Sequence, residues 1–382
     1  MNRILAKTLN EHTPLAMMKR FHRALEPLVS PAARHAQAYL AEQYYPAVVT
    51  RVKPLVGQAV LIEFKLLDGY RLNYRSGQSI QVSVPVGAVV FQRPYSFCSA
   101  PHENRYAIAV QKRHKGRLSS YLRHNLHIGD KLYIDEPEGE FVLPVLNTES
   151  ERYVMIAGGM GVIPVFSMIK DLLGKYREAD VQLILVSQKH DPALFTKEIE
   201  KLERKHPRFS VVYHCTDKKE GGYDADRQLD GENLLSRLSD PGRARFFVGG
   251  PSVLVKKCIS GFLKAGLPES SIKVETFQYS VRELHPAAAG LMPKKMTFMP
   301  STRTRKTIRL QQQQVETVLE TAQSVGLSTL EPCEDGCCQK CRMKVKSGTV
   351  ILDEPHSLSL EDAKKGCILA CQAYPVEDLV IR

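Results

Sequence analysis

The stretch Cys333-Glu-Asp-Gly-Cys-Cys338-Gln-Lys-Cys341 places three potential ligands in one tight segment, and Cys371 follows much later in the chain. Read as ligands, Cys333, Cys338 and Cys341 have the spacing C-x4-C-x2-C with a distant fourth thiolate, which is a ligand spacing of [2Fe–2S] clusters. Thiolate sulfur is the soft ligand that such clusters require. Gly336 lets the loop pass close to an inorganic core because it has no Cβ. We therefore predict that the four cysteines hold a [2Fe–2S] cluster.

Composition indicates several domains in a reducing compartment. The chain of 382 residues is too long for one ordinary hydrophobic core, which predicts two or three domains. Its content of 43% apolar and 25% charged residues is typical of a globular protein. Nine cysteines without a secretory signal predict a cytoplasmic location. No apolar run approaches the ~20 residues of a membrane-spanning helix. The net charge of +12 suits phosphorylated cofactors, an anionic membrane surface or an acidic protein partner. No nucleic-acid motif accompanies this charge, so no nucleic-acid partner is expected.

Residues 1–46 predict a helical N-terminal extension. Apolar residues recur at helical spacing among basic ones between Leu15 and Leu28, and residues 32–45 predict a second helix. A basic amphipathic segment can lie on a membrane or dock a partner. More often such a stripe packs on its own domain. We favour that interpretation and keep peripheral contact with the inner membrane as the alternative.

Short β-rich runs separated by turn residues follow from Ala47, and they predict a small antiparallel barrel over residues 47–148. Within it, Arg93-Pro-Tyr95-Ser96 would offer a bound flavin a phosphate contact, an aromatic face and a hydroxyl. Lys112 and the turn Gly116-Arg-Leu118-Ser119 come next, and the backbone N–H groups of this turn would cradle a phosphate. Together the two motifs predict a flavin site, with FAD favoured over FMN because of the turn.

A buried strand from Arg152 runs into Gly158-Gly159-Met-Gly161-Val-Ile-Pro164 and then a helix. Strand, glycine turn and helix form the dinucleotide arrangement, in which pyrophosphate lies over a helix N-terminus. Strand and helix patterns alternate as far as Gly249-Gly250-Pro251. Residues 149–284 therefore predict a parallel sheet with its ligand at the strand C-termini. Lys189 and Arg227 are candidates to bind a 2′-phosphate, which favours NADPH as the nucleotide. Asp191 lies close to Lys189 in the chain, so NADH is kept as the alternative.

A linker over residues 285–293 precedes a C-terminal domain over residues 294–382. Within this domain, Met296-Thr-Phe298 and Thr307-Ile-Arg-Leu310 are expected to pair as a hairpin. Residues 315–326 predict a helix that leads to the cysteine loop.

The order in which the motifs occur along the chain is itself informative. Along the chain come Arg93-x-Tyr-Ser96, Gly158-Gly-x-Gly161-x-x-Pro164, Gly249-Gly-Pro251, Glu275-x-Phe277 and the cysteine loop. From residue 47 to the end, the chain resembles the ferredoxin–NADP reductase family fused to a C-terminal plant-type ferredoxin. The resemblance implies a multidomain fold class: an antiparallel β-barrel flavin domain, an α/β parallel-sheet nucleotide domain and an α+β β-grasp ferredoxin domain.

The resemblance implies roles for single residues. Arg93 is expected to contact the flavin phosphate, Tyr95 to stack on the isoalloxazine and Ser96 to lie near its reactive nitrogen. Residues 116–119 are expected to hold the FAD pyrophosphate, and Glu275 to lie near the nicotinamide. Tyr95, Ser96 and Glu275 are thus the catalytic candidates. The cofactor-binding candidates are Arg93, Tyr95, Ser96, Lys112, Gly116, Leu118, Ser119, Gly158, Gly159, Gly161, Pro164, Lys189, Arg227, Gly249, Gly250 and Pro251.

The implied activity is electron transfer from NAD(P)H through the flavin to the [2Fe–2S] cluster and on to a partner protein. A comparable N-terminal extension is found in reductases that resemble partners of membrane acyl-CoA Δ9-desaturases. This likeness favours a di-iron fatty-acyl desaturase or hydroxylase as the partner, and lipid desaturation as the process. The alternative is the reductase component of a soluble oxygenase of the Rieske, cytochrome or di-iron type.

Two observations weigh against this interpretation. Gly249 stands where most relatives carry a cysteine beside the nicotinamide, which puts the efficiency of hydride transfer in question. The four cysteines also allow a structural zinc site in a binding module with a vestigial reductase fold. Zinc sites usually combine two short C-x2-C-like pairs, whereas here three ligands crowd one end, so the cluster is favoured.

Overall fold

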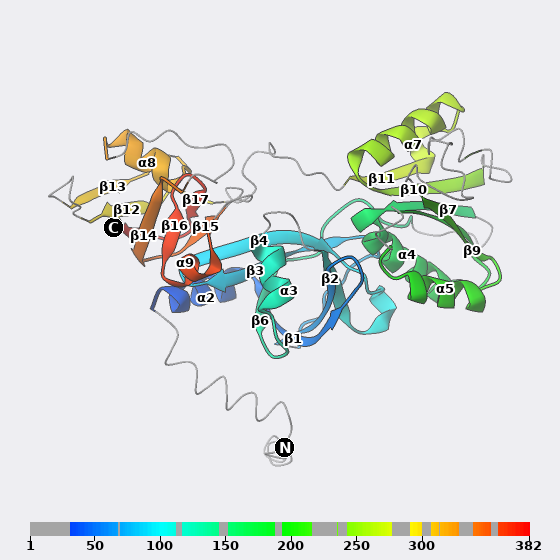
Figure 1. Ribbon diagram of the computed structural model, residues 1–382, viewed down its shortest axis with the longest axis horizontal. Coiled ribbons are helices and arrows are strands. Elements are labelled where there is room, and N and C mark those ends of the chain that lie inside the picture. The colour runs from blue at the N-terminus through cyan, green and yellow to red at the C-terminus, as the bar shows by residue number, and fades with distance from the viewer. Residues whose placement is uncertain are drawn as a thin grey trace, which may run out of the picture.

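The computed structural model describes residues 31–67, 69–111, 117–144, 152–187, 193–215, 235, 243–276, 291–299, 307–312, 314–327, 339–352 and 358–382. The predicted amphipathic stripe between Leu15 and Leu28 lies outside these residues. A β-barrel occupies the middle of the molecule, with a C-terminal domain on one side and a parallel sheet with its helices on the other (Figure 1). Among the helices described here, none is long and apolar enough to cross a membrane.

The barrel is the antiparallel structure that the period-two pattern predicts. Its strands are ordered β4-β3-β6-β1-β2-β5, and a bridge between Phe97 and Ile108 joins the end of β4 to β5 and closes it. Side chains alternate between the two faces of a strand, so residues such as Ile62 and Ile80 fill the interior. The elements are β1 (Tyr45–Pro54), β2 (Ala59–Leu66), β3 (Ser79–Val86), β4 (Val89–Ser96), η2 (Pro101–Glu103), β5 (Tyr106–Gln111), α3 (Arg117–His124) and β6 (Lys131–Ile134).

The second sheet is wholly parallel, with the order β11-β10-β7-β8-β9. This confirms the predicted α/β domain. Its central strands are nearly continuous runs of buried residues, as expected when helices cover both faces. Its elements are β7 (Arg152–Gly158), η3 (Gly159–Gly161), α4 (Val162–Lys175), β8 (Asp180–Ser187), α5 (Thr196–Lys205), β9 (Phe209–Cys215), β10 (Ala244–Gly250), α7 (Ser252–Lys264), η5 (Glu269–Ser271) and β11 (Ile272–Thr276).

The C-terminal domain contains a mixed sheet of order β13-β12-β18-β14-β16. The predicted hairpin is present as the antiparallel pair β12–β13. The predicted helix is shorter than residues 315–326, because Thr317 and Glu320 cap it reciprocally and so set its first turn. The elements are β12 (Lys295–Phe298), β13 (Ile308–Gln311), α8 (Val318–Ser324), β14 (Arg342–Ser347), β15 (Val350–Leu352), α9 (Leu360–Lys364), β16 (Cys367–Leu369), β17 (Ala373–Pro375) and β18 (Leu379–Ile381).

Two strands of the C-terminal domain do not belong to that sheet. β15 pairs in parallel with the start of β4, with Val350 opposite Val89 and Ile351 opposite Val90. β17 pairs antiparallel with β15. The barrel sheet therefore has eight strands and runs without interruption into the C-terminal domain.

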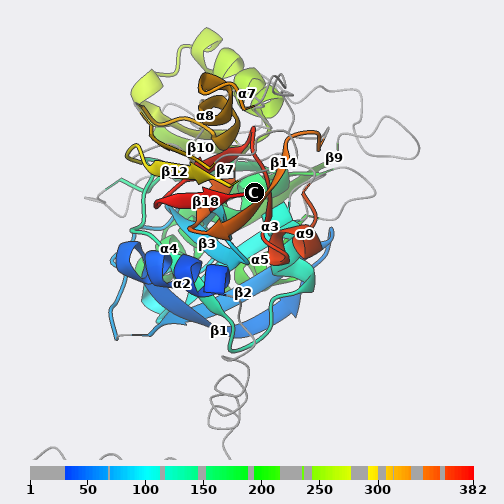
Figure 2. The same cartoon turned by 90° about the vertical axis from the view of Figure 1, so that its left-hand side faces the viewer.

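Helix α2 (Pro31–Gln43) is the described part of the N-terminal extension. Its side chains Ala36 and Leu40 are fully buried, in a cluster that includes Val90 of the barrel and Ile351 of the C-terminal domain. In both views the helix lies just below the C-terminal domain (Figures 1 and 2). α2 thus packs within the protein, whereas the interpretation favoured for the stripe between Leu15 and Leu28 concerns residues outside those described and stays a prediction.

Gln312 is a buried polar residue that holds the start of the C-terminal domain. Its side-chain amide donates to the carbonyl of Glu316 at 3.0 Å and to Oγ1 of Thr321 at 2.8 Å, and its oxygen accepts from the backbone N–H of Lys294 at 3.1 Å. Truncation would leave these partners unsatisfied in the interior, which costs more than losing exposed hydrogen bonds.

We predict that Gln312→Ala destabilises the C-terminal domain by roughly 1–3 kcal/mol. The measurement is the urea midpoint at which the visible absorbance of the bound cluster is lost. Gln314→Ala is the matched control, because Gln314 is exposed and, among the described residues, its amide donates to the carboxylate of Glu316 alone. Equal midpoints for the two variants would show that the buried network contributes nothing.

Candidate functional site

The predicted flavin contacts lie on β4, in the half of the strand far from its pairing with β15. Tyr95 and Ser96 are buried, at 8% and 7% exposure, and Arg93 is partly buried two residues before Tyr95. Leu118 and Ser119 lie at the start of α3, are buried, and belong to the helix that packs against β4 and β5. The structure thus brings the two predicted flavin motifs together. Lys112 and Gly116 lie outside the described residues.

The two glycine motifs of the parallel sheet meet at its carboxyl edge. Strands β7 and β10 are neighbours, with Ala157 opposite Gly249. A Cβ on Gly161 would lie 2.0 Å from the carbonyl oxygen of Gly249, and a Cβ on Gly158 would lie 2.6 Å from the side chain of Leu254. At Gly161 the two backbones therefore approach as closely as only glycine allows. This is the edge at which a parallel α/β sheet binds its ligand.

Gly159, Pro164, Gly250 and Pro251 lie in the same two segments as these glycines. A Cβ on Gly249 would lie 3.0 Å from the carbonyl oxygen of Gly161. The glycine that replaces the expected cysteine therefore has a packing reason in this chain. Lys189 and Arg227, the candidates for a 2′-phosphate, lie outside the described residues.

Glu275 lies on the edge strand β11, directly opposite Gly249 in the parallel ladder. It lines a cleft of about 430 Å³ whose other wall is formed by the barrel residues Gly77, Ser79 and 138–141. Burial raises the pKa of this carboxyl to about 7. Its Oε2 has no hydrogen-bond partner among the described residues. The structure therefore places a carboxyl that can hold a proton near neutral pH between the barrel and the nucleotide sheet.

Two of the four predicted cluster ligands are described. Cys341 Sγ and Cys371 Sγ are 3.2 Å apart and nearly buried, although 30 residues separate them in the chain. The contact with Cys371 lowers the pKa of the Cys341 thiol, which favours the thiolate that binds iron. Both sulfurs are close enough to ligate one iron, so this donor pair fits a [2Fe–2S] cluster. Cys333 and Cys338 lie outside the described residues.

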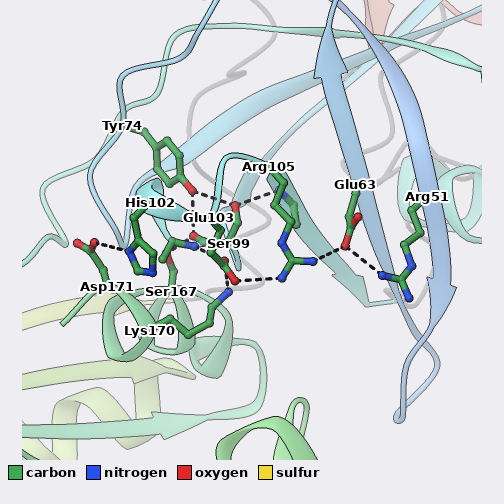
Figure 3. A network of polar contacts seen from close by, with 12 residues as sticks. Arg51, Glu63, Tyr74, Ser99, His102, Glu103, Arg105, Ser167, Lys170 and Asp171 are labelled. Atoms are coloured by element: carbon green, nitrogen blue, oxygen red, sulfur yellow. Dashed lines mark hydrogen bonds and ion pairs between the residues drawn. The ribbon is translucent and has the colours of Figure 1, made fainter. Parts of the chain in front are cut away.

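A polar network that the sequence did not reveal joins the barrel to helix α4 (Figure 3). Lys170 of α4 pairs with Glu103, which also accepts from Arg105 at 3.0 Å. Asp171, which is buried, accepts from Ser76 Oγ at 3.0 Å and lies 3.4 Å from His102 Nδ1. These contacts hold the helix that follows the Gly158–Gly161 turn against the flavin barrel.

Electrostatics and close packing support this contact. Burial is the largest single influence and would raise the pKa of Glu103. The charge and hydrogen bond of Lys170, together with the hydrogen bonds from the Ala100 backbone and Arg105, outweigh it, so the pKa is lowered. A Cβ on Gly174 would lie 2.6 Å from the imidazole of His102, so α4 approaches the barrel closely here. Ser167 Oγ also donates to the carbonyl of Ser99 at 2.5 Å. No local pattern marks these residues, because their partners lie far away in the chain.

Comparison with known proteins assigns the three parts. Sequence profiles match the oxidoreductase FAD-binding domain over residues 47–143, the oxidoreductase NAD-binding domain over residues 155–258 and the 2Fe-2S iron–sulfur cluster binding domain over residues 301–376. The chain is an NAD(P)H-dependent flavin and iron–sulfur oxidoreductase. The predicted FAD, nicotinamide nucleotide and [2Fe–2S] cofactors are thereby confirmed as classes.

Relatives of the oxidoreductase align over most of its length. It is 25% identical to one subunit of the 1,2-phenylacetyl-CoA epoxidase from Escherichia coli, with 88% of this chain and 97% of the relative covered. It is 27% identical to the ferredoxin reductase component of 3-ketosteroid-9-alpha-monooxygenase from Mycolicibacterium smegmatis, with 81% and 87% covered. The glycine betaine monooxygenase reductase subunit of Chromohalobacter salexigens is 24% identical, with 81% and 87% covered.

Solved structures confirm the multidomain fold. Phthalate dioxygenase reductase superposes with a TM-score of 0.52 at 20% identity, covering 89% of this chain and 98% of its own. The FAD/NAD-binding domain of a nitric oxide dioxygenase from Vibrio cholerae gives a TM-score of 0.54 at 21% identity, with 62% and 99% covered. The oxidoreductase therefore has the fold of modular reductases.

We predict that Gly161→Ala weakens NADPH binding to the oxidised protein by about tenfold or more, equivalent to about 1.4 kcal/mol. The new Cβ would push the Gly158–Gly161 turn away from Gly249. The dissociation constant is measured by titration of the flavin absorbance. Gly266→Ala is the control, because a Cβ at Gly266 meets nothing within 4 Å. Unchanged affinity in Gly161→Ala would place the nucleotide elsewhere.

We predict that Glu275→Gln stabilises the protein more at pH 8 than at pH 5. The folded-state pKa of about 7 lies above the ordinary value of 4.5. Between these values the unfolded carboxyl is ionised and the folded one is protonated, so wild-type stability falls as pH rises through this window. The glutamine side chain does not ionise, so the variant does not lose stability in this pH window. The measurement is the difference in melting temperature between variant and wild type at the two pH values.

Glu140→Gln is the control for this experiment, because Glu140 lines the same cleft but is exposed. A difference for Glu275→Gln that is the same at both pH values would mean that the carboxyl is ionised in the folded protein throughout this range.

Proposed function

We propose that the oxidoreductase is the reductase component of an oxygenase. In this role it takes two electrons from NAD(P)H, passes them singly to its [2Fe–2S] cluster and reduces a separate oxygenase protein. When bound, FAD supplies the conversion from hydride transfer to single-electron transfer. The observation that carries the proposal is the continuous sheet in which β4, with Arg93, Tyr95 and Ser96, is joined through β15 to β17, which begins two residues after Cys371.

The residues of this chain have separate tasks in the proposal. Tyr95 and Ser96 present an aromatic ring and a hydroxyl at the far end of β4 from the C-terminal domain, where they orient the flavin. Backbone at Gly161 and Gly249 admits the nucleotide to the edge of the parallel sheet. Glu275 holds a proton near neutral pH beside that edge. The buried thiols of Cys341 and Cys371 hold one side of the cluster.

The names of the relatives support an oxygenase partner. Those aligned over most of the chain belong to two monooxygenases and an epoxidase. The predicted fatty-acyl desaturase has no such support, and the comparisons favour the alternative stated with it. Helix α2 also uses its buried face within the protein, so it gives no argument for a membrane partner. We therefore propose a soluble oxygenase, and we keep NADPH as the preferred donor on the basis of Lys189 and Arg227.

We predict that one equivalent of NADPH, added anaerobically, produces the low-temperature EPR signal of a reduced [2Fe–2S] cluster. Cys371→Ala should lose the signal because it removes a ligand 3.2 Å from Cys341 Sγ. Cys258→Ala is the control: Cys258 is equally buried but lies on α7 of the nucleotide domain, so its loss should leave the signal intact.

Each other outcome contradicts a different part of the proposal. A signal with dithionite but with neither NADPH nor NADH would mean that electrons do not enter through the nucleotide site. No signal with dithionite, together with bound zinc by metal analysis, would overturn the electron-transfer function and support the zinc-stabilised module.

A further inference from the structure

The joint between the barrel and the C-terminal domain is the parallel pairing of β4 with β15. Val350 donates its backbone N–H to the carbonyl of Ala88 at 3.0 Å, and Ile351 lies opposite Val90. Only two residue pairs form this register. So short a parallel pairing is weak alone, and the joint needs further contacts to persist.

Helix α2 covers this joint from one side. The fully buried side chains Ala36 and Leu40 share a cluster with Val90 and Ile351, which are paired with each other across the joint. One face of the helix therefore packs on both domains at once. Separating the domains would expose that face to water, which opposes separation in proportion to the apolar area.

Other contacts extend α2 along both domains. Just beyond its end, the Tyr44 hydroxyl accepts a hydrogen bond from Gln92 of β4 at 2.8 Å, one residue before the predicted flavin contact Arg93. Tyr39 packs on the same cluster, as does Leu291, which lies in the linker before the C-terminal domain. Burial, followed by the neighbouring Tyr44 and Glu377, raises the pKa of Tyr39 to about 12. Tyr39 is therefore a neutral packing residue that lies close to the C-terminal domain.

A second contact lies at the turn between β3 and β4. Gly87 has φ of +64°, and a Cβ there would lie 2.2 Å from the carbonyl oxygen of Ala363 and 3.2 Å from Cα of Lys364. Ala363 and Lys364 belong to α9 of the C-terminal domain. The turn and α9 thus meet backbone to backbone, at a distance that no residue with a side chain allows.

We propose that α2 and the Gly87 turn form an intramolecular clamp that holds the iron–sulfur domain against the flavin barrel in one docked position. The clamp keeps the cluster at a fixed separation from the flavin, so one electron can leave the reduced flavin and enter the oxidised cluster without a prior domain movement. Helix α2 therefore serves the internal step of the relay. The docking of the two domains is inferred from the contacts alone. The effect of docking on the rate of electron transfer rests on the proposed function.

The outer face of α2 agrees with this assignment. The described side chains that point away from the joint are Gln37, Ala38, Ala41, Glu42 and Gln43. They form a small polar surface without an apolar stripe, which offers little to a membrane or a partner groove. The apolar face of the helix is already occupied by the joint.

The first test is hydrogen exchange on the full chain with its cofactors bound. Leu40→Ala removes the centre of the α2 contact, and Gly87→Ala forces the turn away from α9. We expect exchange at residues 350–352 to become at least about tenfold faster in both variants, the change that about 1.4 kcal/mol of lost docking free energy produces. Exchange in β8, within the nucleotide domain, should not change.

Two matched controls separate docking from general damage. Gln37→Ala alters an exposed residue of the same helix. Gly69→Ala introduces a side chain at φ of +70° in the same barrel, but its Cβ meets nothing within 4 Å, so it carries the backbone strain without the contact with α9. Both controls should exchange like the wild type at residues 350–352. Unchanged exchange in Leu40→Ala and Gly87→Ala would overturn the clamp, whatever the redox behaviour.

The second test is anaerobic stopped-flow mixing with NADPH. In the two clamp variants, flavin reduction should stay within about twofold of wild type, and cluster reduction should slow by at least about tenfold, again about 1.4 kcal/mol. Faster exchange without slower cluster reduction would show that docking does not set the transfer rate. A wild-type protein whose flavin is not reduced by either nucleotide would contradict the proposed function, while the exchange data would still decide the clamp.

Discussion

The parallel pairing of β15 with β4 is the interaction on which the relation between the two redox sites depends. One end of β4 carries Tyr95 and Ser96, and the other end is hydrogen-bonded to a strand of the iron–sulfur domain. β17 then extends the same sheet, and it begins just after Cys371. Supported by the contacts of α2 and of the Gly87 turn, this short pairing connects the candidate flavin and cluster sites through backbone hydrogen bonds rather than through the linker alone.

The nucleotide domain is held to the same barrel by side-chain polar contacts rather than by backbone pairing. Here a helix packs on the barrel through charged and hydroxyl side chains, with Asp171 buried among Ser76, His102 and Lys175. Buried ion pairs add little net stability, because desolvation offsets their attraction. They do penalise any shift that separates the partners. Such a contact is suited to fixing the orientation of α4, and with it the glycine turn that α4 follows.

The sequence predicted those features whose signals are local. The C-x4-C-x2-C spacing, the glycine turn before α4 and the alternating strands each lie within one short segment, so the three cofactor classes and the fold classes follow from them. The joint could not be predicted in the same way. β15 is a three-residue strand, and nothing in Val350-Ile-Leu352 indicates a partner as far back in the chain as β4. Gln312 and Asp171 were missed because their partners are also set by tertiary packing.

Gly249 departs from the family pattern, and the structure gives this departure a different interpretation from the one that the sequence alone suggests. From the sequence it indicates a missing thiol beside the nicotinamide, and so a weakened hydride step. In the structure a Cβ there would lie 3.0 Å from the carbonyl oxygen of Gly161 and 3.3 Å from its Cα, so a cysteine would require the glycine turn to move. The adjacent residue across the ladder, Glu275, presents a carboxyl whose pKa burial raises to about 7. The turn and the carboxyl thus lie side by side at this edge of the sheet: close backbone packing leaves little room for a side chain at position 249, and burial favours the protonated form of Glu275 up to near neutral pH.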